Sequence, residues 1–405
     1  MRVCRSVLGG AVVAAAGVLV PVAPAHAFVC PRPPAAAADL PARPAEDLLY
    51  APERLAGFAT GAGVRVAVVD SGVDAANPQL AGHVDRGRDF LHGHPDGRQD
   101  CIGHGTAVAS VIAAAARAGA GLRGLAPGAT IVPVRVSERT GDGGDPAGPG
   151  TFAAAIAWAA SPGGGDADVI NLSLVTTRDD PRIRAAVQDA LNAGVVVVAA
   201  AGNQGADGPP PFPAAYPGVL GVGALGPDGV LAGFSQRGDY VDVTAPGVGV
   251  TIAVPGRGQT TGQGTSFATP FVAATAALIR QRFPTLTPAQ VTRRIQATAD
   301  PAPGGARSDA YGTGVLNPYR ALTETLAAQA SPAPRPALLF PPAAGAAART
   351  QARDQSLVVA AGGAGVLLLV AAGAAAVRHG RRREWRPPID DPALQRDGYG
   401  RSWGR

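Results

Sequence analysis

Residues 64–70 read VRVAVVD, a short and mostly apolar run that lies between Gly63 and Gly72 and ends in Asp70. A run of this length, rich in β-branched residues and bounded by glycine, predicts a strand that is buried on both faces. Its last residue is of interest because open α/β sheets build their sites at the carboxyl ends of parallel strands.

Strands and helices are predicted to alternate downstream of this run. Strands are expected at 129–136, 167–174 and 195–203 and in the segments YPGVLGVGAL and VDVTAPG, and helices at 106–116, 151–160, 181–194 and 287–299, with one more that opens at Ser266 and ends near Arg282. This alternation predicts an α/β fold, with helices covering both faces of a parallel sheet.

The two ends of the 405-residue chain differ in composition from its middle. A signal peptide is predicted over 1–27, with an uncleaved anchor as the alternative. The prediction rests on Arg2 and Arg5 at the start, the apolar run that follows and the small residues of the segment APAHA. Residues 28–60 are rich in Pro and Ala and are interpreted as an extended N-terminal extension. The catalytic domain is expected over 61–325.

A second apolar run follows a Pro/Ala-rich spacer at 326–355. Residues 356–377 carry no charge and are long enough to cross a bilayer, so they predict a transmembrane helix rather than a buried core helix. The basic tail at 378–405 begins with an arginine cluster, which predicts a cytoplasmic C-terminus and an extracellular domain on a single-pass type I membrane protein.

The net charge and the cysteines indicate which partner to exclude and which disulfide to expect. The net charge is +5, all of the cationic charge is arginine, and part of it clusters in the tail, so no nucleic-acid partner is expected. Cys4 lies in the signal segment. Export would leave Cys30 and Cys101, which predicts a disulfide between them, with two free thiols as the alternative.

Three segments supply the residue types of a nucleophilic triad. Asp70 begins the tripeptide DSG, His104 lies in GHGTAVASVI, and Ser266 lies in GTSFATP at a predicted helix start. A serine hydroxyl needs a base to remove its proton, and the base needs a group that orients it. Asn203, at the end of VVVVAAAGN, is a candidate second donor to an oxyanion, beside the Ser266 N–H. Phe267 is expected to pack beside Ser266 without taking part in the chemistry.

These motifs, in the order Asp, His, Ser, resemble those of the subtilisin-like serine proteases, the subtilase family. The resemblance covers roughly residues 61–325 and implies peptide-bond hydrolysis of protein substrates without a cofactor. The whole layout of signal, extension, protease domain, spacer, membrane helix and basic tail resembles one branch, the mycosins. That likeness implies a membrane-anchored endopeptidase that processes proteins exported by a type VII secretion system and associates with its membrane complex.

Two other functions stay open, namely a scaffold subunit of the secretion complex with secondary protease activity and a general degradative surface protease. Val175 stands where degradative subtilases usually have glycine and predicts a restricted substrate pocket. No acidic cluster matches a subtilase calcium site, and no metal site is expected. The His- and Asp-rich segment before His104 is interpreted as a solvated loop rather than a metal site, because its spacing matches no standard set of ligands. Its residues of these types are His83, Asp85, Asp89, His92, His94, Asp96 and Asp100.

Overall fold

The computed structural model describes residue 30 and residues 34–138 and 148–326. The chain separates into two compact units, Met1–Ser331 and Pro332–Arg405, and all described residues belong to the first. The predicted signal peptide and the predicted membrane span at 356–377 lie outside the described residues. Within the described part of the chain, no helix combines the length and the apolar character needed to cross a membrane.

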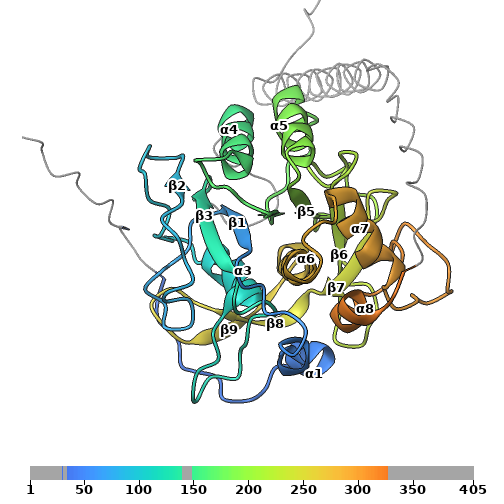
Figure 1. Ribbon diagram of the computed structural model, residues 1–405, viewed down its shortest axis with the longest axis horizontal. Coiled ribbons are helices and arrows are strands. Elements are labelled where there is room, and N and C mark those ends of the chain that lie inside the picture. Colours follow the sequence, from blue (N-terminus) through green and yellow to red (C-terminus); the bar gives the residue numbers. More distant parts are fainter. Residues whose placement is uncertain (1–29, 31–33, 139–147, 327–405) are drawn as a thin grey trace, which may run out of the picture. The chain divides into compact units, whose positions relative to one another are not determined.

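A seven-stranded parallel sheet forms the centre of the first unit (Figure 1). Its order is β2-β3-β1-β4-β5-β6-β7, and each neighbouring pair is parallel. The strands are β1 (Arg65–Asp70), β2 (Arg88–Asp89), β3 (Thr130–Arg135), β4 (Val169–Leu172), β5 (Val196–Ala200), β6 (Leu220–Leu225) and β7 (Val243–Pro246). The predicted α/β fold with a parallel sheet is confirmed.

Helices cover both faces of this sheet, as Figure 1 shows. The helices α4 (Pro149–Ala160) and α5 (Pro181–Asn192) lie on one face, and α3 (His104–Ala113) and α6 (Thr265–Arg282) lie on the other. Successive side chains of β1 point to opposite faces of the sheet and so pack into two different cores. Val66 and Val68 pack into the core that contains α3 and α6, whereas Ala67 and Val69 pack into the core that contains α4 and α5. The apolar residues of β1 are thus buried on both faces of the sheet.

Helix α6 is the helix that passes through the larger core. Its residues from Thr265 to Ile279 are all buried, and many of them are alanines that allow close packing. Its first turn therefore has little freedom to move. Apart from the helices of the N-terminal extension, the remaining elements are the antiparallel pair β8 (Val248–Ala253) and β9 (Gln259–Gln263), and the helices α7 (Pro288–Ala297) and α8 (Pro318–Thr323).

The N-terminal extension is extended only in part, which corrects the prediction. It contains two short helices, α1 (Ala45–Tyr50) and α2 (Pro52–Leu55). Leu55 is fully buried, and the ring of Tyr50 lies 5.3 Å from that of Phe271 on α6, measured between centroids. The extension has no strong apolar period of its own, so its helices depend on these tertiary contacts.

Backbone hydrogen bonds hold the extension along the β8–β9 pair. Ala37 N–H donates to the Arg257 carbonyl at 2.9 Å, and Gln259 N–H donates to the Ala38 carbonyl at 3.1 Å. Further along, Thr251 N–H donates to Glu46 Oε1 at 2.7 Å. The extension is therefore an integral part of the first unit.

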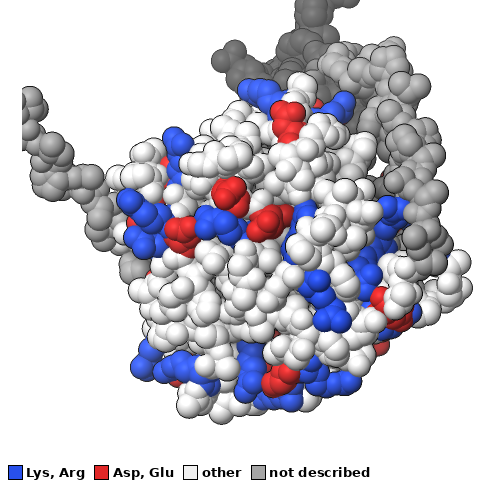
Figure 2. Space-filling model, viewed as in Figure 1, with Lys and Arg blue, Asp and Glu red and all other residues white. Residues whose placement is uncertain are grey.

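Arginine and acidic side chains are interspersed on the face that Figure 2 shows. The ion pairs among the described residues include Arg98 with Asp96 at 2.8 Å and Arg117 with Asp39 at 2.7 Å. Exposed pairs of this kind contribute at most about 1 kcal/mol each, so the fold depends on its two apolar cores rather than on them.

Asp47 on α1 makes the attachment of the extension sensitive to pH. It is buried, and its Oδ2 has no hydrogen-bond partner among the described residues. Burial, helped by the charge of Glu46, raises the pKa of Asp47 from 3.8 to about 7. The folded state thus binds this proton more tightly than the unfolded state. Its contribution to stability is present at low pH and is lost as the pH rises through about 7.

We therefore expect Asp47→Asn to flatten the part of the pH dependence of Tm that lies between about pH 4 and 7. The measurement is the Tm of the wild type and of the variant across this range. Leu48→Ala, which changes an exposed and non-titrating side chain of the same helix, is the matched control and should keep the wild-type slope. An unchanged slope in Asp47→Asn would contradict this assignment.

Candidate active site

The carboxylate that ends β1 faces the imidazole that begins α3. Asp70 is fully buried, and its Oδ1 and Oδ2 lie 2.8 and 3.0 Å from His104 Nδ1. The His104 side chain is 17% exposed. A carboxylate that accepts from Nδ1–H selects the tautomer in which Nε2 is able to take up a proton. Two of the predicted site residues are thus in direct contact.

A glycine makes this close approach possible. A Cβ at Gly105 would lie 2.1 Å from the Gly72 carbonyl oxygen and 3.1 Å from the Asp70 Cβ. Any side chain there would push the start of α3 away from the turn that follows β1. Gly105 of the GHG motif is therefore required by packing, whereas His104 is the residue with a predicted chemical role.

Ser266 is the second residue of α6, and it is buried, with 8% of its surface exposed. The next residue, Phe267, has its ring centroid 5.4 Å from that of His104. This contact places the first turn of α6 beside the imidazole. The sequence predicts that Phe267 packs beside Ser266 away from the chemistry, and its contact with the His104 ring corrects that prediction.

The Ser266 hydroxyl and the Asn203 amide border the same small space. A Cβ at Gly264 would lie 3.0 Å from Ser266 Oγ and 3.5 Å from Asn203 Nδ2. Gly264 has a φ of 145°, a conformation that residues with side chains rarely adopt. Glycine at this position thus keeps the space open between the hydroxyl and the amide.

The orientation of the Asn203 amide follows from its contacts with the start of α6. Asn203 Oδ1 accepts from Thr265 N–H at 2.7 Å and from Thr265 Oγ1–H at 2.8 Å. Only the amide oxygen is able to accept, so these contacts identify Oδ1 and thereby Nδ2, which lies 3.5 Å from the position that a Cβ at Gly264 would take.

The end of β4 contributes a further contact to this turn. Ser173 Oγ donates to the Ser266 carbonyl at 2.9 Å and accepts from Asn171 Nδ2 at the same distance. Because β1, β4 and β5 are neighbours in the sheet, their carboxyl ends bring Asp70, Ser173 and Asn203 to one edge. The structure thus brings all four predicted residues, Asp70, His104, Asn203 and Ser266, to one region.

The segment before His104 is where the sequence interpretation fails. Asp89 and Asp100 are both buried, so the prediction of a solvated loop is wrong for them. Asp89 accepts from His92 Nδ1 at 2.9 Å and from Arg135 Nη1 at 3.3 Å. The signal that could have indicated burial is the position of Asp100, four residues ahead of His104 and just before the helix start.

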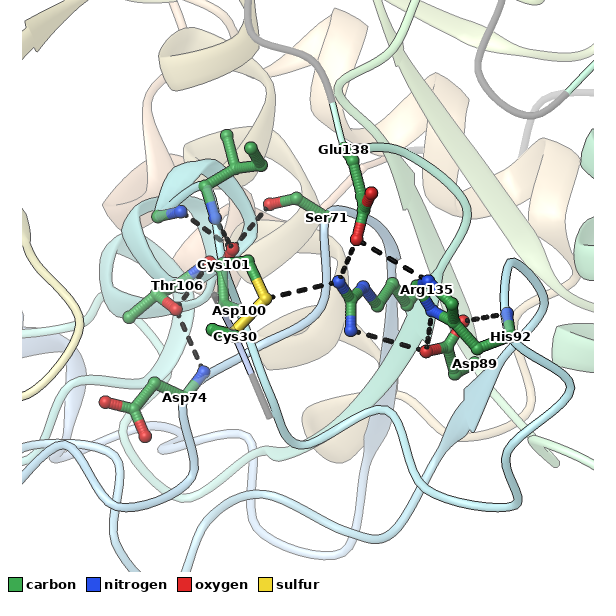
Figure 3. Close-up of a disulfide and its surroundings, with 12 residues drawn as sticks. Cys30, Ser71, Asp74, Asp89, His92, Asp100, Cys101, Thr106, Arg135 and Glu138 are labelled. Carbon is green, nitrogen blue, oxygen red and sulfur yellow. Dashed lines mark hydrogen bonds and ion pairs between the residues drawn. A yellow bond between two sulfur atoms is a disulfide. The ribbon is translucent and has the colours of Figure 1, made fainter. Parts of the chain in front are cut away.

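The predicted disulfide between Cys30 and Cys101 is present in the structure, with 5.3 Å between the two Cα atoms. It joins the start of the extension to the loop that precedes His104. Arg135, which is buried, donates from Nη2 to Cys101 Sγ at 3.3 Å and to Glu138 Oε1 at 2.6 Å (Figure 3). Among the described residues, no group of three or more His, Cys, Asp and Glu side chains is placed to hold a metal ion.

Comparison with known proteins identifies the family. The model of the subtilase family matches residues 61–314, which include Asp70, His104, Asn203 and Ser266. The chain belongs to the subtilase family of serine peptidases. This subtilase is 39% identical to Subtilisin E of Bacillus subtilis over 261 residues, which are 64% of this chain and 65% of that relative. The chain therefore spans just under two thirds of the length of Subtilisin E.

Mycosins are also similar to this subtilase. Mycosin-1 of Mycobacterium tuberculosis is 37% identical over 337 residues, with 70% of this chain and 74% of the relative covered. Among solved structures, MycP1 from the ESX-1 type VII secretion system superposes with a TM-score of 0.65 at 33% sequence identity. That match covers 76% of this chain and 93% of MycP1, so the likeness extends across nearly all of the MycP1 structure.

Proposed function

We propose that this subtilase is a serine endopeptidase in which Asp70, His104 and Ser266 form the catalytic triad. The observation that carries the proposal is the pair of hydrogen bonds from His104 Nδ1 to the buried Asp70 carboxylate, next to the first turn of α6. The chemistry of such a site is the hydrolysis of a peptide bond through an acyl-enzyme.

In the proposed mechanism, His104 Nε2 removes the proton from Ser266 Oγ as the oxygen attacks the carbonyl carbon of the substrate. Asp70 holds the imidazole and stabilises the imidazolium that forms. The carbonyl oxygen becomes negatively charged and accepts from Asn203 Nδ2–H and Ser266 N–H. His104 then donates its proton to the leaving amine, and water releases the acyl group by the same steps in reverse.

The proposed substrates are proteins exported by a type VII secretion system, and the proposed partner is the membrane complex of that system. The similarity to Mycosin-1 and to MycP1 from the ESX-1 system supports both. The sequence supports a corresponding layout, with a signal peptide at 1–27, a catalytic domain at 61–325, a spacer at 326–355 and a membrane-spanning helix at 356–377.

The test of the catalytic proposal is labelling of the full-length protein with a fluorophosphonate, which reacts with activated serines. We expect the wild type to be labelled and Ser266→Ala to show no labelling. Asn203→Ala keeps the nucleophile and loses one oxyanion donor, so its labelling rate should fall by about 10²- to 10³-fold. Labelling of Ser266→Ala at the wild-type rate would overturn the assignment of the nucleophile.

The proposed topology has its own test. Protease added to wall-stripped cells should cut the spacer and release the catalytic domain, while an epitope added after Arg405 stays protected. The physical reason is that arginine-rich flanks such as the one from Arg378 to Arg383 remain on the cytoplasmic side. Digestion of the epitope together with protection of the domain would show the opposite orientation.

A further inference from the structure

The buried carboxylate of Asp100 accepts hydrogen bonds from five groups, which Figure 3 shows around it. Its Oδ1 accepts from Ser71 Oγ at 2.9 Å, Ile102 N–H at 3.0 Å and Gly103 N–H at 2.7 Å. Its Oδ2 accepts from the N–H and the hydroxyl of Thr106 at 2.8 and 2.6 Å. Only 4% of Asp100 is exposed.

These contacts join the two chain segments that carry Asp70 and His104. Ser71, which follows Asp70, donates to Asp100 and accepts from the N–H of Gly105, which follows His104, at 2.9 Å. Thr106 also donates to Asp100, and its hydroxyl accepts from Asp74 N–H at 2.9 Å. These hydrogen bonds therefore fix the turn after β1 to the first turn of α3, with one link through Ser71 and a second through Thr106.

The start of α3 depends on this carboxylate and on Ser71, because its own N-cap residue offers no side-chain cap. Its N-cap residue is Gly103, which has no side chain to accept from the exposed N–H groups of the first turn. Asp100 accepts from two N–H groups near that start, those of Gly103 and Thr106. A carboxylate near a helix N-terminus also interacts favourably with the helix dipole.

All five partners donate, so the arrangement suits a carboxylate and not an amide. Burial raises the pKa of Asp100, and the hydrogen bonds from Thr106, Gly103 and Ile102 oppose that rise. An asparagine at this position would place an NH₂ group against donors and would leave at least one of them without an acceptor.

We propose that Asp100 is a positioning residue, which holds the first turn of α3 so that the His104 imidazole stays aligned with Asp70. It acts through Ser71, Gly105 and Thr106 and touches no reacting atom. The inference rests on the proposed catalytic roles of Asp70 and His104. A catalytic group that is displaced by about 1 Å can cost about 10²-fold in rate, so the loss of this anchor should reduce activity without removing any catalytic residue.

The experiment measures the rate constant of fluorophosphonate labelling of the purified full-length protein from pH 5 to 9. We expect Asp100→Asn to lower this rate by about 10- to 100-fold. We also expect the midpoint of its pH profile to move to lower pH, because an imidazolium that is less well aligned with Asp70 is less stabilised. Ser71→Ala, which keeps the carboxylate but loses one link, should move both quantities in the same direction by less.

The matched control is Asp89→Asn. Asp89 is equally buried in the same segment, but its side chain contacts His92 and Arg135 rather than the start of α3. This variant is expected to lower Tm while its labelling rate and pH midpoint stay within about twofold of the wild type. If Asp100→Asn acted only by destabilising the whole segment before His104, Asp89→Asn would change the labelling rate and its pH midpoint as much as Asp100→Asn does. That result would overturn the inference.

A wild-type rate and midpoint in folded Asp100→Asn would contradict the positioning role, and if that variant fails to fold, the same result in Ser71→Ala would contradict it. A failure of the proposed catalytic role of His104 gives a different result, because His104→Ala would then still be labelled. Loss of labelling in His104→Ala together with an unaffected Asp100→Asn would contradict this inference alone.

Discussion

The contact between Asp70 and His104 is the interaction on which the rest of the site depends. A fully buried carboxylate is costly unless it is hydrogen-bonded, and Asp70 accepts from His104 Nδ1 and from Ser71 N–H. The contact requires that the end of β1 and the start of α3 lie within hydrogen-bond distance. The parallel sheet meets this requirement because it brings the carboxyl ends of its strands to one edge.

The other parts of the site approach this pair from elements that are distant in the sequence. Helix α6 passes through the larger core and brings Ser266 and Phe267 to the imidazole, and β5 is followed by Asn203, whose amide oxygen is fixed on Thr265. These elements are held by apolar packing, so the hydroxyl, the imidazole and the amide are positioned before any substrate arrives. Such preorganisation is the main source of transition-state stabilisation in many enzymes.

The sequence predicts the parts of this structure that carry a local signal. The run ending in Asp70 was expected at 64–70 and forms β1 over Arg65–Asp70, because a short β-branched run between glycines has few alternatives. The short helices of the extension were missed, since their stability comes from contacts such as that of Tyr50 with Phe271. The sequence wrongly predicts Asp89 and Asp100 as solvated residues, because charge alone does not reveal partners such as Arg135 and Ser71, which come from other segments.

We propose that the Asp70 carboxylate holds His104 in the tautomer that activates Ser266. The most direct measurement is the rate constant of fluorophosphonate labelling in Asp70→Asn at neutral pH, with folding verified by Tm. An amide at this position keeps the shape of the side chain but favours the wrong tautomer, so we expect the labelling rate to fall by about 10⁴-fold. A folded Asp70→Asn protein that is labelled within about tenfold of the wild-type rate would show that Asp70 does not have this role.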